Sequence, residues 1–220
     1  MQQILVYSDS LSWGIVPNTR KRLGFAERWP GVMEDHLIRA GRSVRVIEDC
    51  LNGRRTVWED PFKPGRNGLT GLQQRIEVSS PLGLVVLLLG TNDFQTTHSY
   101  NAWHSAQGVA TLVRAIRTAP IEPGMPVPEI LIVAPPPART AKGAMAPKFE
   151  GADVKSKGLA EALADVATEL GCPFYDAGRV VKVSAVDGVH LDADQHLVLA
   201  HVLAKEVAGL LDKAAADAPR

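Results

Sequence analysis

The sequence predicts an α/β fold, with a single domain built on a doubly wound, mainly five-stranded parallel sheet and helices on both of its faces. Five short apolar runs alternate with helical patterns, and a repeated strand–helix–strand order implies right-handed crossovers. The third and fourth runs are apolar throughout, which is typical of strands buried on both faces of a parallel sheet. The expected strands are residues 4–7, 44–47, 84–89, 130–134 and 174–175.

Apolar periodicity also predicts the helices between and after these strands. Residues 109–116 carry apolar side chains at helical spacing, and residues 159–170 do the same until Gly171, which is placed to end the helix. A last helix follows Asp192, a suitable N-cap, and carries apolar residues as far as Leu211.

Composition indicates an ordinary folded domain. The 24 basic residues balance 24 acidic ones, so we expect neither nucleic acid nor an anionic membrane as a partner. The longest apolar run, residues 84–89, is far too short to cross a bilayer. Two cysteines, Cys50 and Cys172, fit a reduced, cytoplasmic setting better than a disulfide scaffold. We expect one domain over residues 1–212 and a frayed tail over residues 213–220.

The fold class indicates where a ligand should bind, because ligands of open parallel sheets lie beyond the carboxyl ends of the strands. Ser10, Gly53 and Asn92 follow the first, second and third expected strands, and Asp187 and His190 precede the last helix. We therefore expect these residues to converge at one edge of the sheet.

The residue types at this edge are those of nucleophilic catalysis. A serine becomes a good nucleophile when a base takes its proton, and the base works best when a carboxylate orients it. Asp187 and His190 are three residues apart, so one turn can present both side chains on the same side. A glycine N–H and an asparagine amide, as at Gly53 and Asn92, can stabilise the oxyanion that develops on an ester carbonyl.

In combination these segments resemble the SGNH hydrolases, also called GDSL-like lipases and esterases, over nearly the whole chain. The resemblance implies the flavodoxin-like fold of that family, with Ser10 as nucleophile, His190 as base and Asp187 as its orienting acid. It also implies an oxyanion hole made by Ser10, Gly53 and Asn92. The matching segments are Ser-Asp-Ser-Leu-Ser-Trp-Gly at 8–14, Asn-Gly-Arg-Arg-Thr at 52–56, Gly-Thr-Asn-Asp at 90–93 and Asp-Gly-Val-His at 187–190.

One position departs from the family pattern. The family usually has glycine two residues before the nucleophile, and this chain has Ser8. A serine there would be strained if the position required a positive φ, and it fits if the position is only the last residue of a strand. We favour the second interpretation, because the rest of the segment is intact.

The surrounding sequence is most similar to the small intracellular arylesterase and acyltransferase branch, which forms homo-oligomers. This resemblance implies a serine esterase acting on short-chain aryl or acetyl esters through an acyl-enzyme, with acyl transfer to alcohols as a second reaction. The alternatives are a carbohydrate O-deacetylase of the same fold and a flavodoxin-like binding module without catalysis. The binding module is disfavoured because it would not need Ser10, Asp187 and His190 together.

Several further residues receive expected roles. Trp13 and Phe94, neighbours of the catalytic segments in sequence, are expected to bind substrate by flanking the leaving group. Asp9 and Asp93 are expected to brace loops or cap helices, and the other histidines to lie at the surface or at helix ends. The long segment at residues 135–149 should cover the site or contact a neighbouring subunit. The spacings typical of metal ligands and cofactor motifs are absent from the sequence, so no cofactor and no metal is expected.

Overall fold

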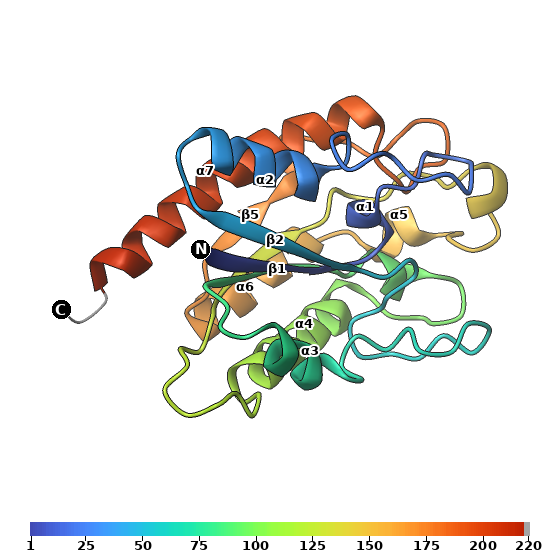
Figure 1. The fold of residues 1–220 in the computed structure, drawn as a ribbon. Coiled ribbons are helices and arrows are strands. Elements are labelled where there is room, and N and C mark those ends of the chain that lie inside the picture. The colour runs from blue at the N-terminus through green and yellow to red at the C-terminus, as the bar shows by residue number, and fades with distance from the viewer. Residues whose placement is uncertain (218–220) are drawn as a thin grey trace.

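The computed structural model describes residues 1–217 and has the predicted α/β architecture (Figure 1). Five parallel strands form one sheet in the order β2-β1-β3-β4-β5, the strand order of flavodoxin-like doubly wound sheets. All five expected strands are confirmed, and most extend slightly beyond the apolar run that predicted them. Their bounds are β1 Gln2–Ser8, β2 Val44–Cys50, β3 Leu84–Leu88, β4 Glu129–Ala134 and β5 Phe174–Asp176.

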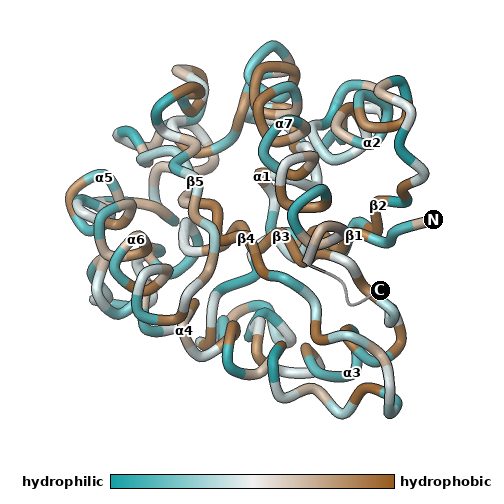
Figure 2. The backbone as a smooth tube through the Cα atoms, turned by 90° about the vertical axis from the view of Figure 1, so that its left-hand side faces the viewer, coloured by the Kyte–Doolittle hydropathy of each residue, from teal (hydrophilic) through white to brown (hydrophobic). Residues whose placement is uncertain are grey.

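Helices cover both faces of the sheet (Figure 2). Two of them, α2 (Trp29–Arg39) and α7 (Ala193–Asp217), pack on one face. On the other face lie α3 (Leu72–Ser79), α4 (Ala102–Arg117) and α6 (Leu159–Leu170). The sheet is therefore the middle layer of a three-layer domain.

The first strand illustrates why the sheet is apolar on both sides. Ile4 and Val6 belong to the apolar cluster under α2 and α7, whereas Leu5 and Tyr7 belong to the cluster under α4 and α6. Successive side chains of a strand point to opposite faces, so a strand covered on both faces needs a continuous apolar run.

The last helix extends beyond the boundary expected from the sequence. It begins directly after Asp192, as predicted, but continues to Asp217 rather than ending near residue 212. Alanine has the highest helix propensity, and the run of alanines after Lys213 carries the helix onward. The guanidinium of Arg42 donates to both carboxylate oxygens of Asp212, at 2.9 and 2.7 Å, just before this extension. The rest of the expected tail, residues 218–220, lies outside the described residues.

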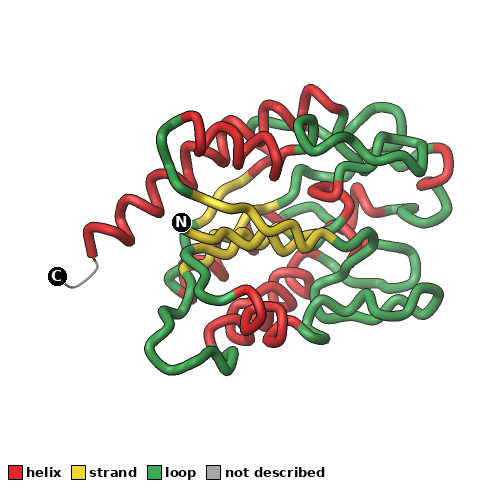
Figure 3. The backbone as a smooth tube through the Cα atoms, viewed as in Figure 1, coloured by secondary structure: helices red, strands yellow, loops and turns green. Residues whose placement is uncertain are grey.

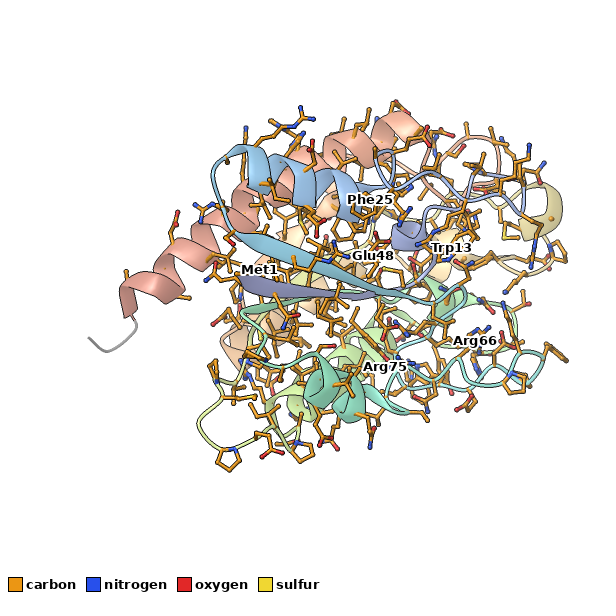
Figure 4. All side chains as sticks on the ribbon, viewed as in Figure 1. Met1, Trp13, Phe25, Glu48, Arg66 and Arg75 are labelled. Atoms are coloured by element: carbon orange, nitrogen blue, oxygen red, sulfur yellow. The ribbon has the colours of Figure 1, made fainter. Side chains whose placement is uncertain are left out.

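Short elements gather at the carboxyl edge of the sheet, where the long loops lie (Figure 3). Trp13 and Arg66 lie at this end of the molecule, and Met1 lies at the opposite end (Figure 4). Within residues 1–217, no helix combines the length and apolar character that crossing a bilayer requires. The short elements are α1 (Ser10–Trp13), η1 (Thr91–Phe94), η2 (Gly143–Met145), α5 (Ala152–Lys155) and η3 (Ala177–Arg179).

Candidate active site

The end of β1 places Ser10 at the carboxyl edge. Ser8 is the last residue of the strand and is fully buried; its hydroxyl donates to the carbonyl oxygen of Leu88 at 2.7 Å and lies 2.6 Å from the hydroxyl of Ser12. In the described chain, Asn18 alone among non-glycine residues has a positive φ. The departure from the family pattern at Ser8 is therefore unstrained, as we favoured.

Ser10 is the first residue of the short helix α1. Asp9 caps this helix, because its Oδ1 accepts the N–H of Leu11 at 2.9 Å. The first N–H groups of a helix have no partner within the helix, so the N–H of Ser10 is available to a ligand. The Oγ of Ser10 lies 3.1 Å from Nε2 of His190, which is hydrogen-bonding distance.

Asp187 holds the other side of the His190 ring. Its Oδ2 accepts from Nδ1 of His190 at 2.7 Å, and its Oδ1 accepts the backbone N–H groups of Val189 and His190 at 2.9 and 3.0 Å. Burial would raise the pKa of this fully buried carboxyl group, but the hydrogen bonds from His190 and Val189 outweigh it and hold the pKa well below its ordinary value. Asp187 is therefore ionised, and it fixes the tautomer in which Nε2 can accept a proton.

Two further donors lie beside Ser10. Gly53 has a φ of +83°, a conformation that glycine adopts without steric cost. The Nδ2 of Asn92 donates one hydrogen to Oδ2 of Asp9 at 2.8 Å, and its Oδ1 accepts from Nε2 of Gln95 at 2.7 Å. An amide nitrogen carries two hydrogens, so Asn92 keeps one for a ligand. Ser10, Gly53, Asn92 and His190 all line one pocket.

Asp9 and Asp93 brace this arrangement, as the sequence predicted. Asp93 accepts from the N–H of Thr56 at 2.9 Å, from the hydroxyl of Thr56 at 2.8 Å and from the hydroxyl of Ser105 at 2.7 Å. Burial raises the pKa of each aspartate to about 6, although the hydrogen bonds that each accepts oppose the rise. The two carboxyl groups tie the loops after β1, β2 and β3 to one another.

The pocket in front of Ser10 has a volume of about 270 Å³. Trp13 lines it, as expected, but Phe94 does not. The Phe94 side chain is 1% exposed and packs in the apolar core under α4 and α6, because η1 turns it inward. The lining residues are Ser10, Trp13, Ile15, Arg20, Asn52, Gly53, Lys63, Asn92, Met145, Lys148, Phe149 and His190.

The segment at residues 135–149 covers the site, which was one of its two expected roles. Met145 and Phe149 form a pocket wall. The backbone of this segment is joined to the loop that holds Asp187 and His190, since the N–H groups of Arg139 and Lys142 donate to the carbonyl oxygens of Gly188 and Asp187, both at 2.9 Å. The fit is close, because a Cβ on Gly188 would lie 2.6 Å from the carbonyl oxygen of Thr140.

Two buried arginines support the site and were not anticipated. Arg54 donates to the carbonyl oxygen of Ser8 at 2.9 Å, and its guanidinium lies 3.9 Å from the ring centre of Tyr7. Arg55 donates to Oε1 of Gln95 at 2.8 Å, and Gln95 in turn holds Asn92. Two consecutive arginines directly after Gly53 were the signal available in the sequence, but nothing in the pattern showed that both are buried.

The remaining histidines divide between helix ends and surfaces, as predicted, with one refinement. His196 is fully buried, and its Nδ1 accepts the N–H of Trp29 at the start of α2. The pKa of His196 is lowered to about 4, mainly by burial and in smaller part by the nearby His190 and Arg28. Across residues 1–217, no three His, Cys, Asp or Glu side chains are grouped so that they could hold a metal ion.

Several known proteins that are similar to this chain in sequence and fold are esterases. The GDSL-like lipase/acylhydrolase family matches residues 9–201. The native aryl esterase of M. smegmatis is 33% identical, with a TM-score of 0.89 over 96% of this chain and 100% of its own. Est24, a carbohydrate acetylesterase from Sinorhizobium meliloti, is 31% identical, with a TM-score of 0.89 and coverages of 96% and 100%. A carbohydrate acetylesterase family member from the same organism is 34% identical, with a TM-score of 0.90 and the same coverages. No curated protein matches the chain.

Proposed function

This chain belongs to the GDSL-like lipase/acylhydrolase family and is a carboxylic ester hydrolase, and we propose that it hydrolyses short-chain aryl or acetyl esters through an acyl-enzyme on Ser10. The observation that carries the proposal is the unbroken series of hydrogen bonds from Asp187 through His190 to Ser10, at 2.7 and 3.1 Å. This series ends at the pocket that Gly53 and Asn92 also line.

The first half of the reaction forms the acyl-enzyme. Ser10 Oγ attacks the carbonyl carbon of the ester while its proton passes to Nε2 of His190. The electron pair of the carbonyl moves to its oxygen, which accepts hydrogen bonds from the N–H groups of Ser10 and Gly53 and from the amide of Asn92. The intermediate then expels the alcohol, which takes the proton from His190, and the acyl group stays on Ser10.

The second half releases the acid. His190 takes a proton from a water molecule, whose oxygen attacks the acyl carbon, and the bond to Ser10 breaks as Oγ regains a proton. An alcohol in place of water would give a new ester. The apolar side chains of Trp13, Ile15, Met145 and Phe149 support this second outcome, because they offer no hydrogen bond that would hold a water molecule beside the acyl group.

The size of the pocket supports short acyl groups. Its volume of about 270 Å³ is at the lower end for ligand sites, and the covering segment limits it on one side. We expect kcat/KM on p-nitrophenyl esters to be highest for acetate and butyrate. A steady climb from acetate to palmitate would contradict the short-acyl proposal, and added benzyl alcohol yielding no benzyl ester would remove only the acyl-transfer part.

The role of Ser10 is tested by covalent labelling. Ser10→Ala should abolish both turnover and labelling by a fluorophosphonate, while Ser12→Ala, a matched change on the same short helix, should still label. Stoichiometric labelling of the Ser10→Ala protein would refute the acyl-enzyme.

A carbohydrate O-deacetylase is the second candidate. It is favoured by the two carbohydrate acetylesterase structures, which are 31% and 34% identical to this chain. A panel of acetylated sugars beside phenyl acetate separates the two, since a deacetylase should release acetate from the sugars with the higher kcat/KM.

We also propose a homo-oligomer that works in the cytoplasm. Large apolar side chains support the assembly, because Phe62 is 85% exposed and Trp103 is 62% exposed, and such side chains often mark interfaces. Both cysteines are free thiols, which supports a reducing compartment. Light scattering that finds only a species of 23.7 kDa would contradict the oligomer.

A further inference from the structure

The pocket that holds Ser10 is lined by cations and by no carboxylate. Arg20, Lys63 and Lys148 line it together with apolar and neutral polar side chains. The three cations come from three different segments, which follow α1, β2 and β4. None of them forms an ion pair with any residue in 1–217. We call these three residues the rim of the pocket.

The two buried arginines that support the site are paired with carboxylates. Arg54 pairs with Asp49 at 2.7 Å, and Arg55 pairs with Asp60 at 3.5 Å. Asp60 is also engaged by the N–H of Phe62, which donates to its Oδ1 at 3.0 Å. Asp60 is the carboxylate that attracts Lys63 and Lys148, and it is therefore already paired with the buried guanidinium of Arg55.

Among the three rim residues, Lys148 has the positive charge that its surroundings stabilise least. It is half-buried, and burial lowers the pKa of its ammonium group. Asp60 opposes this, but the positive charges of Lys63, Arg55 and Arg20 lower the pKa further. Cations that repel one another at the mouth of a small pocket are stabilised by any anion that enters it.

We propose that the physiological ester carries an anionic group, a carboxylate or a phosphate, which Lys148, Lys63 and Arg20 bind while the ester carbonyl lies at Ser10. The inference rests on the proposed function, because it names the substrate class of the same pocket. The apolar walls and the cationic rim together fit a small ester with an apolar middle and one charged end.

Matched pairs of esters test the charge alone. One pair places it on the alcohol side, with 4-acetoxybenzoate against its methyl ester. The other places it on the acyl side, with mono-4-nitrophenyl adipate against 4-nitrophenyl hexanoate. Each kcat/KM is divided by the rate of hydroxide-catalysed hydrolysis of the same ester, so that intrinsic reactivity cancels.

We expect the anionic member of at least one pair to be preferred by about tenfold at low salt. The preference should shrink towards unity in about 0.5 M NaCl, because salt screens exposed charges. The pair that shows the preference tells whether the rim contacts the acyl side or the alcohol side of the ester. Equal normalised rates within both pairs would overturn the inference.

Charge reversal at position 148 tests whether Lys148 binds the anionic group of the ester. Lys148→Glu keeps the backbone hydrogen bonds of this position, to Met145 and from Thr96, and should reduce the ratio of anionic to neutral rates by about tenfold or more. Lys205→Glu, the same charge change at an exposed position of α7, should leave the ratio unchanged. Lys63→Glu replaces Lys148→Glu if the latter does not fold, and an unaltered ratio in the folded variant contradicts the assignment.

The two proposals fail in different ways. If neutral and anionic esters are both untouched and a fluorophosphonate does not label Ser10, the proposed function is wrong. If neutral esters are hydrolysed and Ser10 is labelled, but charge gives no preference, only the anionic substrate class is wrong.

Discussion

The floor of the pocket, which is formed by the groups that face Ser10, differs from the rim in how its polar side chains are held. On the floor, the groups that face Ser10 are held by neighbours, since Asn92 is fixed by Asp9 and Gln95, and His190 by Asp187. On the rim, Arg20, Lys63 and Lys148 line the pocket without an ion pair in residues 1–217. The floor is preorganised for one chemical step, whereas the rim keeps its charge for a ligand.

The largest effect should come from breaking the floor at His190. His190→Ala removes the base, and we expect kcat to fall by about 10⁴–10⁶, with the Ser10→Ala/His190→Ala double variant little worse than either single one. Steady-state rates and thermal melting of the three proteins check this. Additive losses in the double variant would show that the two residues do not act as a unit.

The oxyanion donor should give the next largest effect. Asn92→Ala removes a hydrogen bond that matters when negative charge develops on the carbonyl oxygen, so kcat should fall by about 10²–10³ with KM nearly unchanged. Initial-rate kinetics with phenyl acetate measure both constants. A raised KM with unchanged kcat would show that Asn92 binds the substrate and does not stabilise the oxyanion.

Loss of the group that holds Asn92 should have a smaller effect. Gln95→Leu removes one of the two hydrogen bonds that hold the amide of Asn92 and leaves the one to Asp9. We expect kcat to fall by about tenfold, because the donor is less well placed. Gln74→Leu, on the exposed surface of α3, is the matched control and should be neutral. If both variants retain full kcat, the floor does not depend on this support.

The last expected effect concerns stability rather than rate. The ordinary pKa of histidine is 6.5, and that of buried His196 is about 4, so between these pH values the unfolded chain binds a proton that the folded chain does not. Stability from this group is therefore full above pH 6.5 and lost as pH falls towards 4. The free energy of unfolding of the wild type relative to His196→Asn should fall by about 2–3 kcal/mol over that range. Urea titrations at several pH values measure it, and a constant difference between the two proteins would exclude this titration.

The contrast between floor and rim also explains what could be predicted from the sequence. The sheet and the grouping of Ser10, Asp187 and His190 follow from local patterns, because apolar runs define strands and parallel strands end at one edge. Phe94 was misplaced because adjacency to Asn92 in sequence says nothing about where a turn directs its side chain.

The walls and supports of the pocket depend on contacts between segments far apart in sequence. Met145 and Phe149 reach Ser10 only because their segment folds back over the site. Arg54 and Arg55 received no role from the sequence, and only the packed structure shows that they are buried among acceptors. Such placements arise from tertiary structure, which single-sequence patterns do not encode.

The hydrogen bonds that join the covering segment to the loop of Asp187 and Gly188, which we call the seam, have a consequence for how this enzyme can be redesigned. The backbone of residues 139–142 is hydrogen-bonded to that of Asp187 and Gly188, so a change of loop length there would displace Asp187. Exchanges of side chain at Met145 and Phe149 leave that seam intact. Libraries that vary the composition of the wall and hold its length constant should therefore yield active enzymes with altered scope, whereas indel libraries across the seam should yield mostly inactive ones.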